Sequence, residues 1–184
     1  MRAIVALAVA SSLWFGGSAA WAQPLEDENV LLAPPAGFEV GYNETSRDRV
    51  TLIEWVPAGE TVDNWSEIVT VLIFRKRPDL DPEGFLRMLQ DKWLTDCKGA
   101  APAPVTKGNL NGYGSATMLM RCPLFPSTGK PETTIFVGIK GKDAFYMVQR
   151  AVRAAGSPAE VERLRAYMAK VSACDTRSRA HPCP

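Results

Sequence analysis

The chain has 184 residues, of which 46% are hydrophobic and 22% are charged, and its formal net charge is +1. This length suits one ordinary domain with a substantial core. A net charge so close to zero gives no bulk attraction to nucleic acid or to an anionic membrane, so the composition argues against both as partners.

The first 22 residues predict a secretory signal peptide. A positive start at Arg2 precedes an apolar run over residues 3–15, and the small-residue pattern AWA ends at Ala22. The alternative is a membrane anchor, but the apolar run is shorter than the roughly 20 residues that a spanning helix needs. We therefore expect cleavage after Ala22, a periplasmic or secreted mature chain, and no membrane insertion after cleavage.

The region after the leader divides into three parts. Residues 23–36, QPLEDENVLLAPPA, are acidic and then proline-rich, and we expect them to be extended or mobile on the surface. Residues 37–174 are expected to form a single α+β domain. Residues 175–184 form a short tail that we expect a disulfide to close.

Three strands are predicted in the first half of the domain. FEVGYNET (38–45) and DRVTLIEWVP (48–57) are typical of two strands joined by a polar turn. SEIVTVLIF (66–74) carries apolar residues on both faces. A strand of this kind needs cover on both sides, so it is predicted to be central in a sheet.

Helix-start signals predict two helices. Asp81 is suited to cap the segment DPEGFLRMLQDKWLTDC, and Pro82 suits the first helical position. Ser157 and Glu160 stand three residues apart as a capping box at the start of the last helix. Further strands are predicted between the two helices, in YGSATMLMRC, in ETTIFVGI and in AFYMVQRAV, the last two being joined as a hairpin.

Hairpin-type connections dominate this order of elements. They predict an α+β fold with a largely antiparallel sheet. Because the central strands are apolar on both faces, we expect helices packed on both faces of the sheet, which is an α-β-α sandwich.

Four cysteines in an exported chain predict two disulfides, for which three pairings are possible. Cys174 and Cys183 lie nine residues apart in a proline-containing tail and can close it locally. Cys97 and Cys122 then join the end of a helix to the end of a strand. The alternative is a metal or redox site, but the chain has no C-x-x-C motif and one histidine, so we predict no metal and no cofactor.

This layout resembles the PsbP-type α-β-α sandwich, the fold of the photosystem II extrinsic protein and of bacterial envelope proteins such as DcrB. The resemblance covers roughly residues 37–174 and rests on the element order, the run NWSEIVTVLIF and the closing helix. Members of that fold mostly act as non-catalytic accessory or binding proteins, so the resemblance implies such a role here. A shared fold does not fix function, and the resemblance does not account for the four cysteines.

No known catalytic motif is present in the sequence. The single histidine, His181, lies in the terminal tail, where we expect it to be solvated and poorly placed for a Ser-His-Asp or Cys-His mechanism. Asn43 and Asn64 each begin an N-x-[ST] sequence, which would be a glycosylation acceptor in a eukaryotic secreted protein and has no such meaning in a bacterial one. The short alanine-rich leader favours the bacterial interpretation.

One cluster of acidic residues and tryptophans is the group of side chains most typical of an active site. Its members are Glu54, Trp55, Glu60, Asp63, Trp65 and Glu67. Glycosidases pair two carboxylates across the scissile bond, commonly with aromatic rings against the sugar. Alternation along a strand, however, points Glu54 away from Trp55. The segment is therefore predicted to be a strand, a turn and the start of the central strand, and a ligand-facing rim, if present, would be formed by Glu60, Asp63, Asn64 and Trp65.

The sequence thus favours an exported, non-catalytic accessory or binding protein. Its partner would be an unknown envelope protein or a small ligand. One alternative is a histidine-free carboxylate hydrolase that acts on glycans, and another is a secreted factor that acts on another cell.

Overall fold

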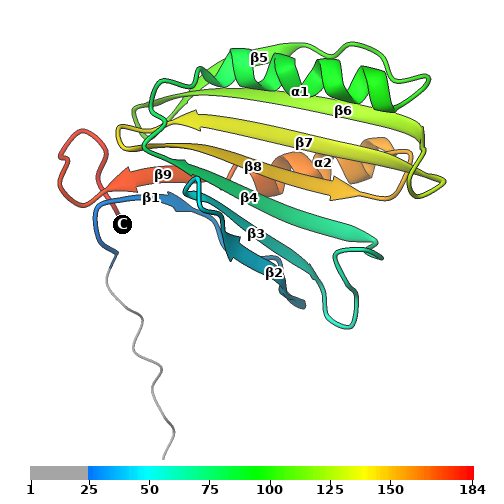
Figure 1. Ribbon diagram of the computed structural model, residues 1–184, viewed down its shortest axis with the longest axis horizontal. Coiled ribbons are helices and arrows are strands. Elements are labelled where there is room, and N and C mark those ends of the chain that lie inside the picture. Colours follow the sequence, from blue (N-terminus) through cyan, green and yellow to red (C-terminus); the bar gives the residue numbers. More distant parts are fainter. Residues whose placement is uncertain (1–24) are drawn as a thin grey trace, which may run out of the picture.

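The computed structural model describes residues 25–184, and the predicted signal peptide with its cleavage site lies outside them. Two helices and nine strands follow one another in the described part (Figure 1). In chain order they are β1 (Glu28–Leu31), β2 (Phe38–Thr45), β3 (Val50–Pro57), β4 (Glu67–Arg75), α1 (Pro82–Asp96), β5 (Val105–Leu110), β6 (Tyr113–Phe125), β7 (Lys130–Lys140), β8 (Ala144–Val152), α2 (Pro158–Met168) and β9 (Ser172–Asp175).

Seven of the strands form one sheet in the order β2-β3-β4-β8-β7-β6-β5. All of its neighbouring strands run antiparallel. The prediction of an α+β fold with a large antiparallel sheet, two helices and two disulfides is therefore confirmed. The strand predicted to be central, β4, lies inside the sheet between β3 and β8.

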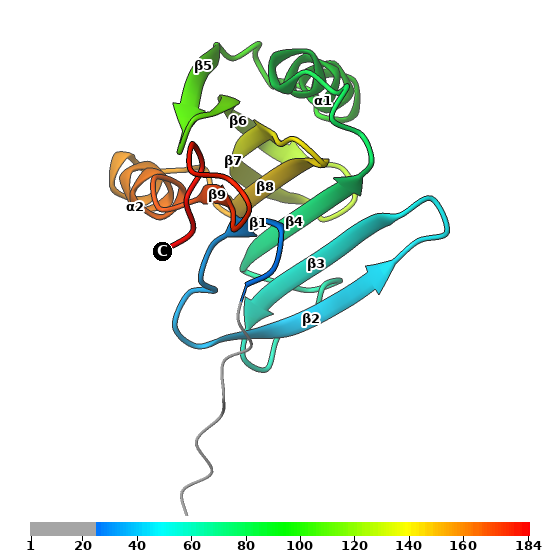
Figure 2. The same ribbon diagram turned by 90° about the vertical axis from the view of Figure 1, so that its left-hand side faces the viewer.

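A second, two-stranded sheet joins β1 to β9. Neither strand was predicted from the sequence. Each has only four residues, and the two that pair lie near opposite ends of the chain. In Figures 1 and 2, β1 and β9 run side by side near one end of β8. Part of the segment 23–36 is therefore paired with the end of the domain, although the domain boundaries themselves stay a prediction.

Local capping explains where the helices begin. The Asp81 carboxylate accepts a hydrogen bond from the Gly84 N–H at 2.8 Å, and Pro82 follows as the first helical residue. At α2, Ser157 and Glu160 form the predicted capping box in both directions. Each cap satisfies backbone donors that a helix start leaves free.

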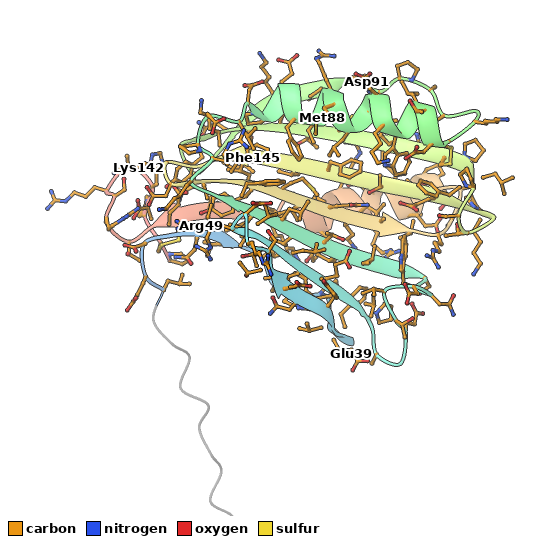
Figure 3. All side chains as sticks on the ribbon, in the orientation of Figure 1. Glu39, Arg49, Met88, Asp91, Lys142 and Phe145 are labelled. Atoms are coloured by element: carbon orange, nitrogen blue, oxygen red, sulfur yellow. A yellow bond between two sulfur atoms is a disulfide. The ribbon has the colours of Figure 1, made fainter. Side chains whose placement is uncertain are left out.

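The two helices belong to different core clusters. Leu86 and Trp93 of α1 pack with residues such as Phe136 and Phe145. Figure 3 shows Phe145 below α1, while Asp91 lies on the outer side of that helix. The residues of β7 and β8 that alternate with these point to the other face of the sheet and form a second cluster together with α2. This second cluster consists of Val71, Tyr113, Ile135, Val137, Ile139, Ala144, Tyr146, Val148, Val152, Leu164, Met168, Val171 and Ala173.

Two disulfides join Cys97 to Cys122 and Cys174 to Cys183, which is the pairing predicted from the sequence. The first ties the residue after α1 to β6, and the second closes the C-terminal tail on β9. No helix within residues 25–184 is long and apolar enough to cross a membrane.

Candidate functional site

The turn predicted as a ligand rim lies between β3 and β4, where local hydrogen bonds occupy its polar atoms. Glu60 accepts hydrogen bonds from the backbone N–H and from the hydroxyl of Ser66, the latter at 2.7 Å. The Asn64 N–H donates to the Thr61 carbonyl at 3.0 Å. These bonds close the loop on itself in the way that turn residues usually do.

Trp65 and Asp63 of the same turn are tied to Arg153, which follows β8. The Arg153 guanidinium lies 4.2 Å from the centre of the Trp65 ring and donates to the Asp63 carbonyl at 3.4 Å. Trp65 also packs against a small cluster that includes Val56 and Ile68. A cation over an indole face is a stabilising contact, so this pair fixes the start of β4. A ligand-binding role for Glu60, Asp63, Asn64 and Trp65 stays a prediction.

Glu54 lies on β3 and is half-buried. Its carboxylate accepts a hydrogen bond from the Thr70 hydroxyl at 3.2 Å, and burial raises its pKa above the ordinary value. Trp55 belongs with the cluster of α2 residues, as the alternation along a strand requires. The carboxylates of Glu54 and Glu60 are thus each engaged by a neighbouring strand or turn residue.

A groove between β1 and the main sheet has the most distinctive geometry. Its volume is about 460 Å³, and we call it the β1 groove. It is lined by Glu26, Asp27, Glu28, Asn29, Val30 and Leu32 from the N-terminal segment and by Ile53, Trp55, Val71, Ile73, Arg75 and Tyr146 from the sheet.

Glu28 holds β1 in place beside this groove. It is only 9% exposed, and its carboxylate accepts hydrogen bonds from the backbone N–H groups of Lys142, Asp143 and Ala144. The Tyr146 hydroxyl donates to the same carboxylate at 3.0 Å. A buried carboxylate with several donors is well satisfied, so β1 is clamped to the β7–β8 turn.

The clamp depends on the turn residue Gly141 and on a neutral Tyr146. A Cβ atom at position 141 would collide with the Glu28 carboxylate and with the Ala144 carbonyl, so only glycine fits there. Burial, and then the negative charge of Glu28, raise the pKa of Tyr146. Tyr146 therefore keeps its proton and remains a hydrogen-bond donor.

One edge of β1 has no strand beside it in the described part of the chain. The Thr176 N–H donates to the Asp27 carbonyl at 3.0 Å, which sets the alternation of the β1–β9 ladder. In an antiparallel pair, every second residue turns its N–H and C=O away from the partner strand. For β1 these residues are Glu28 and Val30, and the Glu28 carbonyl accepts from the Tyr146 hydroxyl at 3.3 Å. The N–H and C=O of Val30, a residue that lines the groove, therefore turn away from β9.

The floor of the β1 groove is apolar. Ile53, Trp55 and Ile73 are partly buried there, while Glu26, Asp27, Asn29 and Arg75 make the rim of the groove polar. An aromatic side chain flanked by aliphatic ones provides contact area for an apolar ligand group. The groove therefore combines a free strand edge with an apolar surface next to it.

The C-terminal tail is ordered against β6, contrary to the expectation of a solvated histidine. His181 stacks on Tyr113 with ring centroids 3.9 Å apart, and its Nδ1 lies 2.8 Å from the Asn111 carbonyl oxygen. The physical reason is the Cys174–Cys183 disulfide, which turns the tail back so that the Asp175 N–H donates to the His181 carbonyl.

Sequence reasoning missed the residues that build the groove. Glu28 lies in a segment whose acidic composition is typical of an exposed tail, and its donors come from more than 110 residues further along the chain. The only usable signal is the apolar run VLL that follows it. Among residues 25–184, no group of three or more histidine, cysteine or acidic side chains is arranged to hold a metal ion.

The chain matches no family model and no curated protein. The solved structures that resemble it in fold include LpqN and PA94. LpqN of Mycobacterium tuberculosis, involved in cell envelope biogenesis, is 15% identical over 80% of this chain and 84% of its own, with a TM-score of 0.48. A Pseudomonas aeruginosa protein of unknown function, PA94, a putative regulator, is 12% identical over 83% of this chain and 90% of its own, with a TM-score of 0.43. Both TM-scores lie below 0.5, so neither likeness identifies a function for this chain.

Proposed function

We propose that this protein is exported and acts without catalysis, by binding an extended polypeptide segment of an envelope partner in the β1 groove. The free backbone edge of β1 beside the apolar floor carries this proposal. Two disulfides support an oxidising compartment, and the predicted leader supports export.

The binding mode follows from the chemistry of a strand edge. An added strand would exchange hydrogen bonds with the Val30 N–H and C=O, and every second side chain would point toward Ile53 and Trp55. Because the Glu28 clamp already holds β1, little order has to be created on binding. Glu26 at one end of the groove favours a basic side chain on the partner, whereas Asp27 is already paired with Arg177.

The finer architecture is part of the same proposal. We propose that α1 and α2 cover opposite faces of the sheet, in a PsbP-like α-β-α sandwich that spans residues 37–174 and is completed by β1. The division of alternate strand residues between two clusters supports this arrangement, as does the separation of α1 from α2 in Figure 2. The turn from Glu60 to Trp65 is a second surface that a partner would meet.

A labelled peptide tests the groove directly. The probe is a fluorescein-labelled octapeptide of alternating threonine and valine with a lysine at each end, and fluorescence polarisation is measured against the mature protein. We expect saturable binding that Val30→Pro abolishes, because proline removes the outward N–H without removing a bond to β9. Trp55→Ala should weaken binding by about tenfold, since it removes most of an aromatic contact.

Matched controls distinguish hydrogen bonding to the edge of β1 from nonspecific binding of the peptide. Val30→Thr keeps the N–H and should bind as the unchanged protein does. The same peptide with proline in place of one central residue should not bind. The proposal fails if the unchanged protein does not bind the alternating peptide, or if Val30→Pro binds it as tightly as Val30→Thr.

A further inference from the structure

A second cavity lies at the β5 edge of the sheet, beside the loop that joins α1 to β5. Its volume is about 600 Å³, which is within the range of small-molecule sites, and we call it the arginine cavity. It is lined by Gly99, Ala101, Pro102, Ala103, Pro104, Thr106, Thr117, Met118, Leu119, Arg121, Pro123, Ile135 and Arg165. The linings thus come from the loop after α1, from β5, β6 and β7, and from α2.

The loop that forms one wall of the arginine cavity is fixed at several points. The Cys97–Cys122 disulfide ties its start to β6. The side chain of Gln90, buried in α1, donates to the Ala103 carbonyl at 2.7 Å. Pro102 and Pro104 restrict the backbone further. The wall is therefore already formed before any ligand binds.

The polar groups of the cavity lack protein partners. Arg121 of β6 and Arg165 of α2 form no ion pair or side-chain hydrogen bond with any residue from 25 to 184, although other arginines of the protein do. The hydroxyls of Thr106 and Thr117 are likewise without a partner in that part of the chain. No aspartate or glutamate lines the cavity, so its charge is positive.

Apolar side chains form the rest of the surface. The partly buried Leu119 forms the floor with Pro102, Pro104 and Pro123 around it, and its almost fully buried neighbour Ile135 closes the bottom. Two guanidinium groups in such a setting match the planar, bidentate geometry of a carboxylate or phosphate. The apolar floor matches a hydrocarbon or aromatic body next to that charge.

We propose that the arginine cavity binds a small amphipathic anion, with its carboxylate or phosphate head on Arg121 and Arg165 and its apolar body on Leu119 and the surrounding prolines. The hydroxyls of Thr106 and Thr117, which are cross-strand partners, line the cavity beyond Leu119. This site is separate from the β1 groove and does not depend on peptide binding there.

Calorimetric titration with three probes of equal chain length tests the proposal. Octyl phosphate and octanoate carry the two head groups, and octanol is the neutral counterpart. At least one anion should bind at least about tenfold more tightly than octanol, because charge-assisted hydrogen bonds are each worth about a factor of ten. Comparison of the two anions identifies the preferred head group, and inorganic phosphate alone should bind more weakly than octyl phosphate.

Charge-neutral variants identify the groups responsible. Arg121→Gln and Arg165→Gln should each weaken anion binding by about tenfold, and the melting temperature should change little because both side chains are exposed and unpaired. The control is the double variant Arg47→Gln with Arg49→Gln, which removes two charges from the β2–β3 turn at the opposite edge of the sheet (Figure 3). The proposal is overturned if neither anion binds, if octanol binds equally well, or if the control weakens binding as much as the cavity variants do.

Discussion

At the scale of single residues, Glu132 on β7 has a carboxylate whose charged form is destabilised by burial. It is 6% exposed, and burial raises its pKa from 4.5 to about 7, against the opposing effect of the positive Arg153. Between these two pH values the folded state keeps a proton that the unfolded chain has lost. Stability therefore falls as the pH rises through this window, and the cost of the buried charge is fully present above about pH 7.

The variant Glu132→Gln should remove that cost. We expect it to be more stable than the unchanged protein at pH 8, by up to about 3 kcal/mol, and nearly equal to it at pH 4. Urea denaturation at the two pH values measures the difference. Glu162→Gln, on the exposed side of α2, is the control and should show no such pH dependence. A constant offset between Glu132→Gln and the unchanged protein at both pH values would contradict the assignment.

The residues that form the β1 groove and the arginine cavity were the hardest to identify from the sequence. Trp65 could be given an anchoring role because its neighbours in the chain are turn residues. Glu28 and Arg121 could not be placed, because their significance depends on which strands lie beside them. Burial of Glu28 requires donors from the β7–β8 turn, and no local pattern around Glu28 contains that information.

At the scale of elements, the Cys97–Cys122 disulfide links stability to the arginine cavity. It closes a loop with a sequence separation of 25 residues, and its loss should lower the free energy of unfolding by about 3 kcal/mol. The double variant Cys97→Ser with Cys122→Ser should also weaken binding of octyl phosphate, since the disulfide holds one wall of the cavity. Calorimetry measures both effects at a temperature where the variant is folded.

The second disulfide provides the matched comparison. Replacing Cys174 and Cys183 by serine should also lower stability, because that disulfide closes the tail on β9. It should leave anion binding unchanged, since the tail does not line the cavity. Equal loss of binding in both double variants would mean that general loosening, and not the wall of the cavity, controls affinity.

Elements with strong local signals could be predicted, and short ones could not. The capping box at Ser157 and the two-faced apolar run of β4 each carry enough information within a few residues. In contrast, β5 reads VTKGNL, a polar strand with a glycine, and four of its six residues are exposed. This strand forms because it can hydrogen-bond to the edge of β6. Such long-range pairing cannot be predicted from the strand propensities of its own residues.

At the scale of the whole molecule, the antiparallel character of the sheet followed from its short connections, but the neighbours of each strand did not. Pairing of β4 with β8 brings together residues such as Glu67 and Val152, which are far apart in the sequence. Such long-range pairings depend on which apolar faces meet, so several arrangements of the same strands satisfy the sequence pattern.

The β1–β9 pairing gives a test of where the folded unit begins. A chain that starts at Gly37, the predicted domain boundary, loses the Glu28 clamp and leaves the buried Tyr146 hydroxyl without its acceptor. It also loses the contacts of Val30 and Leu32 with the core. We expect such a chain to be less stable than one that starts at Gln23, by roughly 2 to 4 kcal/mol, in urea denaturation.

Backbone amides of β9 should also exchange hydrogen faster, because their partner strand is gone. Equal stability of the two chains would mean that the first strand is an accessory to a domain that is complete from Gly37, and the free edge of β1 would then be a poorly held surface for binding a partner.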